Sequence, residues 1–318
     1  MRAAPGSWRV ALRASLTLAA GLTSIALIGR LDLAAYVSFG AFASVYSGAS
    51  TVGSRWSVQA RMGVLLTLAV TTGAFVATLD QTRWWLVPAA AGWAALGQGL
   101  SLRHAWRPPG PLFVVFAVAT SSSIPTQPGD LPVVVLAVAT TAAVAVLFGA
   151  IEERAWSLHS PEGKLERPHD WDWTSMLVCA AAAFLAGLSA TMLGLSHPAW
   201  AVVAGVVPFA AVVRRGQLVR GVQRVLGTAV GLVLAVPLLA VEDPPWFLFV
   251  LVIAVLQGAT ELVVARHYGL ALVFITPLAL LLTQSAAPEP VSSLLASRLI
   301  ETVLGVTIGI TVGRVNRR

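Results

Sequence analysis

The chain has 318 residues, of which 57% are hydrophobic and only 11% are charged, and its mean hydropathy is +0.81. A soluble globular domain has about a quarter charged residues, so this composition excludes that class and predicts a protein that crosses a membrane several times. The net charge of +7 does not indicate nucleic-acid binding, because the arginines stand in short links between apolar runs.

The cysteine and lysine counts exclude further classes of protein. Cys179 is the only cysteine and lies in an apolar run, so one chain cannot form a disulfide or a C-x-x-C site. Lys164 is the only lysine, and no G-x-x-x-x-G-K-[ST] pattern surrounds it, so the sequence contains no P-loop. We expect no cofactor and no metal site. An enzyme is the least favoured class, because no Ser/His/Asp, metal or nucleotide-binding pattern is present.

Apolar runs along the chain predict about twelve membrane-spanning helices. A hydrocarbon core requires about 20 mostly apolar residues per helix, with about 17 to 25 as the usual range. By that measure the spans lie near residues 10–29, 33–51, 60–79, 84–101, 110–126, 131–150, 173–194, 198–213, 219–240, 245–264, 268–284 and 291–313. The first run is expected to remain as a span, because the hydrophobic pattern does not stop after it as it does after a signal peptide.

The distribution of positive charge predicts the orientation in the membrane. With the N-terminus inside, eighteen of the 21 lysine and arginine residues lie in cytoplasmic links or at that interface. Only Arg30 and Arg83 fall outside, and Arg298 lies within a span. The outer links carry acidic residues instead, which are Asp32, Asp80, Asp130, Glu242, Asp243 and Glu289. This bias predicts that both termini are cytoplasmic.

A polar stretch at residues 151–172 divides the chain into two halves of six spans each, at 1–150 and 173–318. Its two histidines, His159 and His169, show no metal-ligand spacing, so we expect a solvated cytoplasmic connector.

The two halves resemble each other in sequence. Residues 20–23 (AGLT) match 186–189 (AGLS), and VQ before Gly63 matches VQ before Gly227. Because six is an even number, both halves have the same orientation. The predicted fold class is therefore an all-α polytopic membrane helix bundle of about twelve transmembrane helices, built as two parallel six-helix repeats.

The link into the ninth span is rich in arginine. Within residues 214–231 (RRGQLVRGVQRVLGTAVG) the positive residues are Arg214, Arg215, Arg220 and Arg224. One interpretation is a topology signal with contacts to anionic lipid. The other is an electropositive mouth that collects small organic anions from the cytoplasm, with Arg220 and Arg224 as substrate contacts. Gly227 and Gly231 follow at G-x-x-x-G spacing, which predicts the close approach of another helix.

The last span contains two ionisable residues, Arg298 and Glu301, beside a stripe of small residues formed by Gly305, Gly309 and Gly313. The stripe predicts that this face packs against another helix, so the charges face protein and not lipid. An ionisable group inside a membrane indicates function by default. Two interpretations remain open. Either the residues form an ion pair that locks the bundle, or Glu301 is a proton-coupling carboxylate and Arg298 its partner or a substrate contact.

The tenth and eleventh spans contribute further candidates. Glu261 lies within the tenth span, about one helical turn from Arg266, and is the second candidate for proton coupling. Tyr268 begins the eleventh span, which Thr276 and the following proline are expected to interrupt, because proline frees a backbone carbonyl. Interrupted spans are the best sequence indication of a binding site in duplicated transporters. Arg266, Tyr268 and Thr276 are therefore candidate substrate contacts.

Aromatic residues occupy roughly corresponding places in the two halves. Tyr36 in the second span and Trp200 in the eighth are the candidates for contact with a substrate. Core packing is the alternative interpretation for both. A pocket that stacks an aromatic ring is the functional one.

Three patterns carry a resemblance to a known family, and they are Arg220-x-x-x-Arg224-x-x-Gly227-Thr228-x-x-Gly231, Arg266-x-Tyr268-Gly269 with Phe274-x-Thr276-Pro277, and Arg298-x-x-Glu301-Thr302-x-x-Gly305. In this order they resemble the fusaric acid resistance (FUSC) family, within the aromatic acid exporter superfamily, and the first half matches more loosely. The resemblance implies a bacterial inner-membrane protein of duplicated six-span modules that exports aromatic carboxylic acids. Many relatives carry a sizeable cytoplasmic domain, and some are thought to work with a periplasmic adaptor, whereas this chain has only the connector.

These observations favour a membrane transporter for gradient-driven efflux of aromatic carboxylic acids or related small organic anions. The alternatives are a non-transporting envelope scaffold protein and a passive anion channel. The expected partners are a small organic anion as substrate, the lipid bilayer and further copies of the chain in a homo-oligomer, with no nucleic acid.

Overall fold

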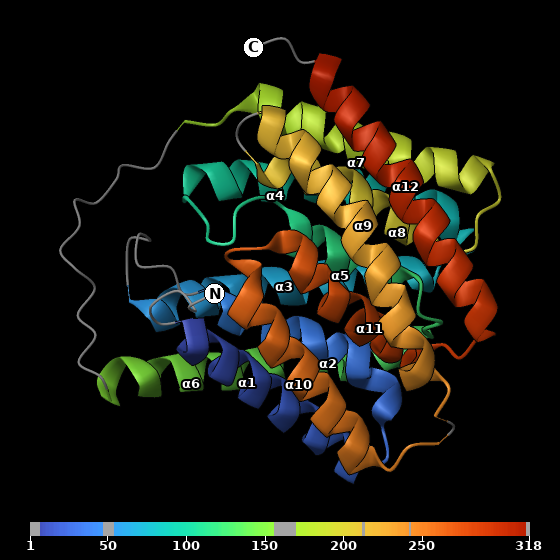
Figure 1. Cartoon of the computed structure of the whole chain (residues 1–318). Coiled ribbons are helices and arrows are strands. Elements are labelled where there is room, and N and C mark those ends of the chain that lie inside the picture. The colour runs from blue at the N-terminus through green and yellow to red at the C-terminus, as the bar shows by residue number, and fades with distance from the viewer. Residues whose placement is uncertain (1–6, 47–53, 156–169, 212–213, 242, 316–318) are drawn as a thin grey trace.

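Helices form all the regular secondary structure in the residues that the computed structural model describes, which are 7–46, 54–155, 170–211, 214–241 and 243–315. Twelve α-helices and four short 3-10 helices follow one another in those residues without a strand (Figure 1). This confirms the all-α class. Most of the connector at 151–172 lies outside the described residues, so the expectation of a solvated loop stays a prediction.

The helices of the two halves have these bounds. In the first half they are α1 (Ser7–Leu27), η1 (Leu31–Leu33), α2 (Ala34–Ala41), η2 (Phe42–Val45), α3 (Arg55–Ala77), α4 (Thr82–Arg103), α5 (Leu112–Ser122), η3 (Pro128–Asp130) and α6 (Leu131–Ala155). In the second half they are α7 (Trp173–Met192), α8 (Pro198–Val206), η4 (Val207–Ala210), α9 (Arg214–Leu239), α10 (Trp246–Val264), α11 (Tyr268–Ala286) and α12 (Val291–Val315). Each of the twelve expected spans overlaps one α-helix.

Within the described residues, eight helices are long and apolar enough to cross a membrane, namely α1, α3, α6, α7, α9, α10, α11 and α12. Three apolar segments are shorter, at Leu31–Val45, Leu112–Ser122 and Pro198–Ala210. α4 has 22 residues but is not among these eight, because Gln98 and its tryptophans interrupt its apolar residues. The structure therefore confirms a multi-pass membrane protein, although four of the twelve expected spans do not reach the length and hydropathy of a membrane helix.

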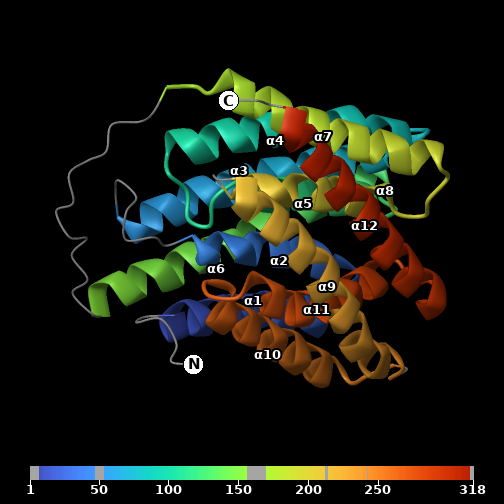
Figure 2. The same cartoon turned by 45° about the horizontal axis from the view of Figure 1, so that its top comes forward.

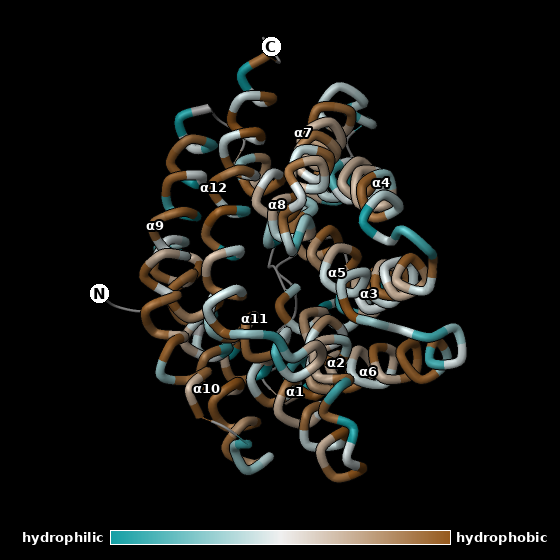
Figure 3. Tube along the Cα trace, turned by 90° about the vertical axis from the view of Figure 1, so that its right-hand side faces the viewer, coloured by the Kyte–Doolittle hydropathy of each residue, from teal (hydrophilic) through white to brown (hydrophobic). Residues whose placement is uncertain are grey.

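The short helices lie in the interior of the bundle, where protein and not lipid surrounds them. All eight residues of α2 and all nine residues of α8 are buried. Figure 3 shows two outer groups of helices, one with α9, α10 and α12 and the other with α3, α4, α6 and α7. Between these groups lie α2, α5, α8 and α11. A helix that ends at membrane depth is tolerated when protein surrounds its free backbone groups, so burial explains why these helices need not span the membrane.

Helix packing follows the same order in the two halves of the chain. α6 packs against α1, α2 and α3, and α12 packs against α7, α8 and α9. Between the halves, α1 packs along α10, and α7 packs along α4 (Figures 1 and 2).

The two ends of the bundle differ in charge. In Figure 2 the starts of α3 and α7 and the ends of α4 and α6 lie toward the left. We call this the arginine-rich end, because Arg55, Arg103 and Arg154 lie on the last or first turns there. The loops between α3 and α4 and between α11 and α12 lie at the other end, and they carry Asp80 and Glu289. We call it the acidic end.

Both glycine patterns lie where helices touch, as their spacing predicts. On α12, a Cβ atom added at Gly305 or Gly309 would overlap the backbone of α8 at Ala201 or Gly205. On α9, a Cβ at Gly227 would overlap the backbone of α11 at Gly269. Glycine is required at these positions because the two backbones meet without room for a side chain.

The expected interruption of the eleventh span is wrong. α11 runs without a break from Tyr268 to Ala286, with Pro277 inside it. Proline removes one backbone donor, but the helix continues because Thr276 and Pro277 are buried against neighbouring helices that hold this turn in place. Two other helices are irregular near prolines: α5 has only 11 residues after its proline-rich start, and α8 ends in the 3-10 helix that contains Pro208.

The glycine contact between α8 and α12 gives a prediction about stability. We expect Gly309→Leu to lower the free energy of unfolding by about 1–3 kcal/mol or more, because the added side chain would force α12 away from Gly205. The measurement is the thermal midpoint of purified protein in detergent. Gly92→Leu is the matched control, because Gly92 lies in α4 with nothing within 4 Å of an added Cβ. Equal stability of the two variants would show that α8 and α12 are not held together at this contact.

Candidate functional site

Two arginine side chains are enclosed in the bundle without a full set of hydrogen-bond partners. Arg298 on α12 is 0% exposed, and Arg224 on α9 is 3% exposed. Among the described residues, none of the three guanidinium nitrogens of Arg298 has a hydrogen-bond partner, and neither has Nε of Arg224. A buried arginine that lacks an anionic partner is strongly destabilising. These unused donors therefore mark the place in the structure where an anion would be most stabilising.

The guanidinium of Arg298 lies over the ring of Trp200 on α8, with 4.6 Å between the guanidinium carbon and the ring centroid. This cation–π contact holds the charge in place but uses none of its N–H donors. The charged and titratable groups that act on Arg298 electrostatically are Arg224, Glu301 and Tyr268. Groups from α8, α9, α11 and α12 thus converge on one buried position.

The direct ion pair between Arg298 and Glu301 that we considered from the sequence is absent among the described residues. Oε1 of Glu301 instead accepts the backbone N–H of His197, with 2.7 Å between the two atoms, and Oε2 is buried without a partner. His197 is the residue that precedes α8. An i, i+3 spacing places the two side chains on one side of α12, but Glu301 reaches the start of α8 while Arg298 lies over Trp200.

Tyr268 connects the second arginine to α11. Nη1 of Arg224 donates a long hydrogen bond to the Tyr268 hydroxyl, at 3.4 Å, and the guanidinium carbon of Arg220 lies 5.0 Å from the centroid of the Tyr268 ring. Tyr268 is buried at the first position of α11, next to Gly269, which contacts Gly227 of α9. The close glycine contact between α9 and α11 therefore brings the tyrosine to the two arginines.

Two hydroxyls continue the polar surface along the contact between α9 and α11. Thr228 and Thr276 are both 0% exposed, and neither Oγ1 has a hydrogen-bond partner in the described part of the chain. Thr276 lies against Gly231. Thr228 was not among the candidates from the sequence, although it occupies a position in the family-like pattern that starts at Arg220.

At the acidic end, His197 connects the buried group to the surface. Its Nε2 lies 2.8 Å from Oε1 of Glu289 in the loop between α11 and α12, and its ring stacks on Trp200 with centroids 4.7 Å apart. Burial, followed by the positive charges of Arg83 and Arg298, lowers the pKa of His197 to about 4. Burial raises the pKa of Glu289. His197 is therefore neutral near pH 7, which fits an Nδ1 that is buried without a partner.

Three of the candidates lie away from this group. Arg266 is exposed at the end of α10. Tyr36 on α2 shares a hydrogen bond with Thr126 in the first half of the chain, at 2.8 Å. Glu261 on α10 is buried, but it accepts a hydrogen bond from Gln257 and faces α1. The structure thus brings together Arg220, Arg224, Tyr268, Trp200, Arg298 and Glu301, and we call these six residues the arginine site.

A second buried network joins the first-half helices and was not predicted. Arg13 on α1 forms an ion pair with Glu152 on α6, which also pairs with Arg55 on α3 at 2.6 Å. Arg13 donates two more hydrogen bonds to the Ser44 carbonyl at the end of η2, and Gln59 donates to the same oxygen. Arg13 is thus fully paired, unlike Arg298, so this network stabilises the fold. Its members are far apart in sequence and share no motif.

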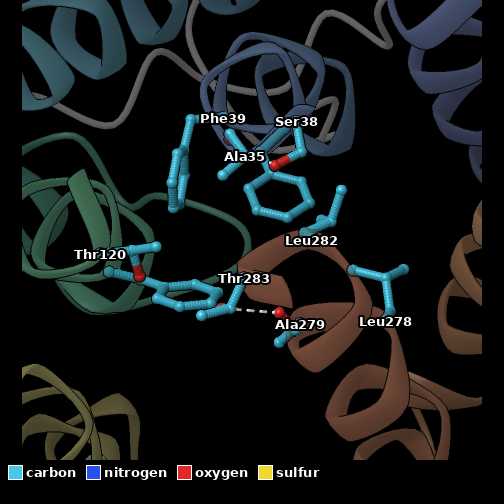
Figure 4. A pocket seen from close by; sticks show the side chains of 10 residues that line it. Ala35, Ser38, Phe39, Thr120, Leu278, Ala279, Leu282 and Thr283 are labelled. Carbon is cyan, nitrogen blue, oxygen red and sulfur yellow. Dashed lines mark hydrogen bonds between the residues drawn. The ribbon is translucent and has the colours of Figure 1, made fainter. Parts of the chain in front are cut away.

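A small cavity lies where α11 meets the first half of the chain (Figure 4). Its lining is aromatic and aliphatic and comes from α2, α5 and α11, with Phe39, Phe116, Leu278 and Leu282 among its residues. Its volume is about 10 Å³, which is room for about one water molecule. An aromatic acid does not fit into this cavity in the conformation described.

These features define a multi-pass membrane protein with cationic groups buried between its helices. A model of the fusaric acid resistance protein-like family matches residues 178–312, which contain all six residues of the arginine site. The second half of the chain is therefore similar to that family, as the sequence patterns indicated. No curated protein and no solved structure matches the chain.

The lowered pKa of His197 predicts how stability depends on pH. The ordinary histidine pKa is 6.5 and the folded value is about 4, so between these values the unfolded chain binds a proton that the folded protein does not. The contribution of His197 to the free energy of unfolding is therefore largest above about pH 6.5 and decreases as the pH falls toward 4. We expect a lower thermal midpoint at mildly acidic pH than at neutral pH.

The matched variant for this prediction is His197→Phe. Phenylalanine keeps a ring that stacks on Trp200 but has no group that titrates. The decrease in thermal midpoint between neutral and mildly acidic pH should be smaller in the variant than in the wild type. A decrease of the same size would show that other groups, such as His104, cause it.

Proposed function

We propose that this protein is a membrane transporter that exports small organic anions, with aromatic carboxylic acids as the main substrate class. The observation that carries the proposal is the pair of buried arginines, Arg224 and Arg298, whose N–H groups are not all used by the protein. Two like charges that act on each other in the interior are stabilised most by an anion between them. A carboxylate suits this role, because it accepts two N–H bonds from one guanidinium.

The surroundings of the arginines support an organic and not an inorganic anion. Trp200 and Tyr268 contribute aromatic surface beside the two guanidinium groups. The hydroxyls of Thr228 and Thr276 offer further donors next to apolar helix faces. A site with a few fixed polar groups in an apolar, partly aromatic lining is typical of small-molecule sites. The Trp200 ring already contacts both His197 and Arg298, so we propose that it orients the Arg298 guanidinium and does not itself stack on the substrate.

We propose that the anion enters from the arginine-rich end, which the charge bias predicts to be cytoplasmic in a bacterial inner membrane. Arg215 is exposed near the start of α9, and Arg220 is half-buried between it and Arg224. These three arginines follow one helix from the surface to the site. A line of positive charge raises the local concentration of anions and guides them inward. The inside-negative membrane potential then favours outward movement of an anion by about 2.3 kcal/mol per charge for each 100 mV.

We also propose that residues 1–150 and 173–318 form two parallel repeats that move relative to each other. The short second helix of each half, α2 or α8, and the packing of α6 and α12 against three helices of their own half support this proposal. The contacts between the halves support it as well, because the first helix of each half packs on the fourth helix of the other, α1 on α10 and α7 on α4. In duplicated transporters the halves rock around a central site. Such movement would have to open the small cavity between α2, α5 and α11.

The test is transport in proteoliposomes that contain the purified protein. The vesicles are loaded in turn with benzoate, 4-hydroxybenzoate and phthalate, and efflux is measured with and without a potassium diffusion potential. Protein-free vesicles correct for permeation of the neutral acids. An exporter moves at least one acid faster than the control, with saturation as its concentration rises. Flux that never saturates would favour a passive anion channel, and no flux with any acid would favour a scaffold protein.

Substitution of the buried arginines should weaken binding of the anion. Each of Arg224→Gln and Arg298→Gln removes charged hydrogen bonds worth about 1.5–3 kcal/mol, so we expect the KM to rise roughly 10- to 150-fold. The measurement is the initial rate of efflux against internal concentration of the best substrate. Arg215→Gln is the control, because it removes the same charge from an exposed position on α9. An equal effect of all three variants would indicate general attraction of anions and no specific site.

The proposed orientation is testable by cysteine labelling in intact cells, after Cys179 has been replaced. Asp80 and Asp243 lie in loops between helices, and Asp130 ends the short helix η3. Single cysteines at these three positions should react with an impermeant maleimide added outside. Cysteines at Gly163 and Arg317, which lie outside the described residues, should react only after the membrane is opened. Labelling of Gly163 in intact cells would contradict the two-half arrangement.

A further inference from the structure

A chain of polar groups connects the arginine site to the acidic end of the bundle. Glu289 lies in the loop between α11 and α12 and is 22% exposed in its side chain. Its Oε1 is 2.8 Å from Nε2 of His197. The backbone N–H of the same histidine donates to Oε1 of Glu301, at 2.7 Å. Three residues thus lead from the surface to a carboxylate that is 0% exposed.

Two atoms in this chain are buried without a hydrogen-bond partner in the described residues, and they are Nδ1 of His197 and Oε2 of Glu301. Nδ1 belongs to the residue whose backbone N–H already bonds to the other oxygen of the Glu301 carboxylate. A hydrogen bond to the backbone alone would need only one oxygen of Glu301. The free nitrogen and the free oxygen do not hydrogen-bond to each other in this conformation, so transfer of a proton between them requires the Glu301 carboxylate to turn toward Nδ1.

Glu301 controls the charge next to the two arginines. The charged groups that act on it are Arg298, Arg83 and Glu289, besides the bond from the His197 backbone. With Glu301 ionised, the site has one negative charge for Arg224 and Arg298. With Glu301 protonated, both positive charges are available to a bound anion. Protonation of Glu301 must therefore increase the affinity of the site for an anion, because a like charge next to a bound anion is removed.

We propose that Glu289, His197 and Glu301 form a proton path from the acidic end, through which the pH on that side sets the affinity of the arginine site. This inference rests on the proposed export of organic anions and adds the group that controls it. A proton on the Glu289 carboxyl passes to Nε2 of His197 while the proton on Nδ1 passes to Oε2 of Glu301. His197 is neutral before and after the transfer and changes only its tautomer.

The surroundings of His197 suit this role. Arg83 on α4 and Arg298 on α12 face it, and together with burial they keep it from holding a positive charge near neutral pH. A histidine that stays neutral can pass a proton on without trapping it. Its contact with Trp200 keeps the ring in one plane beside the carboxylates, with 15° between the two rings.

The experiment measures efflux of 4-hydroxybenzoate from right-side-out membrane vesicles at constant internal pH and constant membrane potential. The external pH is lowered from neutral to mildly acidic. Permeation of the neutral acid out of the vesicle depends on the internal pH, so it stays constant. We expect wild-type efflux at low internal substrate to rise by roughly 5- to 150-fold, the usual range for coupling between two sites.

Three variants test the path, each with thermal stability as a check on folding. Glu301→Gln keeps an oxygen that accepts the His197 N–H but cannot ionise, so efflux should stay at the high level at every external pH. His197→Phe and Glu289→Gln should lose most of the dependence on external pH. Glu289→Gln keeps an acceptor for Nε2 in a partly exposed loop, so it provides the test if His197→Phe does not fold. Asp80→Asn removes another acidic-end carboxylate and should behave as wild type.

The possible outcomes separate this inference from the proposed function. Wild-type efflux that does not respond to external pH would overturn the proton path and leave the transport proposal intact. The path would also be wrong if a stable Glu301→Gln protein lost efflux, or if both His197→Phe and Glu289→Gln kept the full response. Absence of 4-hydroxybenzoate efflux from wild-type vesicles at every pH would instead count against export of that acid itself.

Discussion

The backbone contact between α8 and α12 determines where the groups of the arginine site lie. Gly305 and Gly309 on α12 meet Ala201 and Gly205 on α8 without room for a side chain. Because the helices are so close, Arg298, about two turns before Gly305 on α12, is brought over the ring of Trp200, which directly precedes Ala201 on α8. The same approach places the start of α8 at Glu301. The close contact of α9 with α11 at Gly227 does the same for Arg224 and Tyr268.

Short helices make this polar interior possible. α8 has only nine residues, and all of them are buried. Its start therefore meets α12 inside the bundle, where the backbone N–H of the preceding His197 donates to Glu301. The N-terminal end of a helix carries partial positive charge and free N–H groups, which stabilise a carboxylate such as Glu301. A long helix in the same place would bury a continuous apolar face, and neither the glutamate nor the arginine would have polar neighbours there.

The sequence predicts the helices and the close contacts well, but not the pairing of charges. Hydropathy and the G-x-x-x-G spacings are local patterns, so they identify α9, α12 and the faces on which these helices pack. The partner of a buried charge depends on which helices are neighbours, and that is a long-range property of the fold. This is why the i, i+3 spacing of Arg298 and Glu301 suggested a direct pair, whereas Glu301 bonds to His197.

The same limit explains the unpredicted residues and the misplaced ones. His197 and Glu289 are 92 positions apart and stand in loops, where no periodic pattern identifies a partner. Arg13, Glu152 and Arg55 come from three helices and meet only when α1, α3 and α6 pack together. Tyr36 occupies in the first half roughly the place that Trp200 occupies in the second, but no arginine corresponds to Arg298 on α6, so it bonds to Thr126 instead.

The contrast between the two buried networks helps to separate structural charges from functional ones. Arg13 has a carboxylate and a backbone carbonyl for its N–H groups, so its charge is balanced within the protein. Arg298 has an aromatic ring and a second arginine as neighbours, and Glu301, the carboxylate that acts on it, bonds to the His197 backbone instead. A helix bundle that used Arg298 only for stability would gain from a partner like that of Arg13. The unbalanced charge is more consistent with a group whose partner arrives from outside the chain.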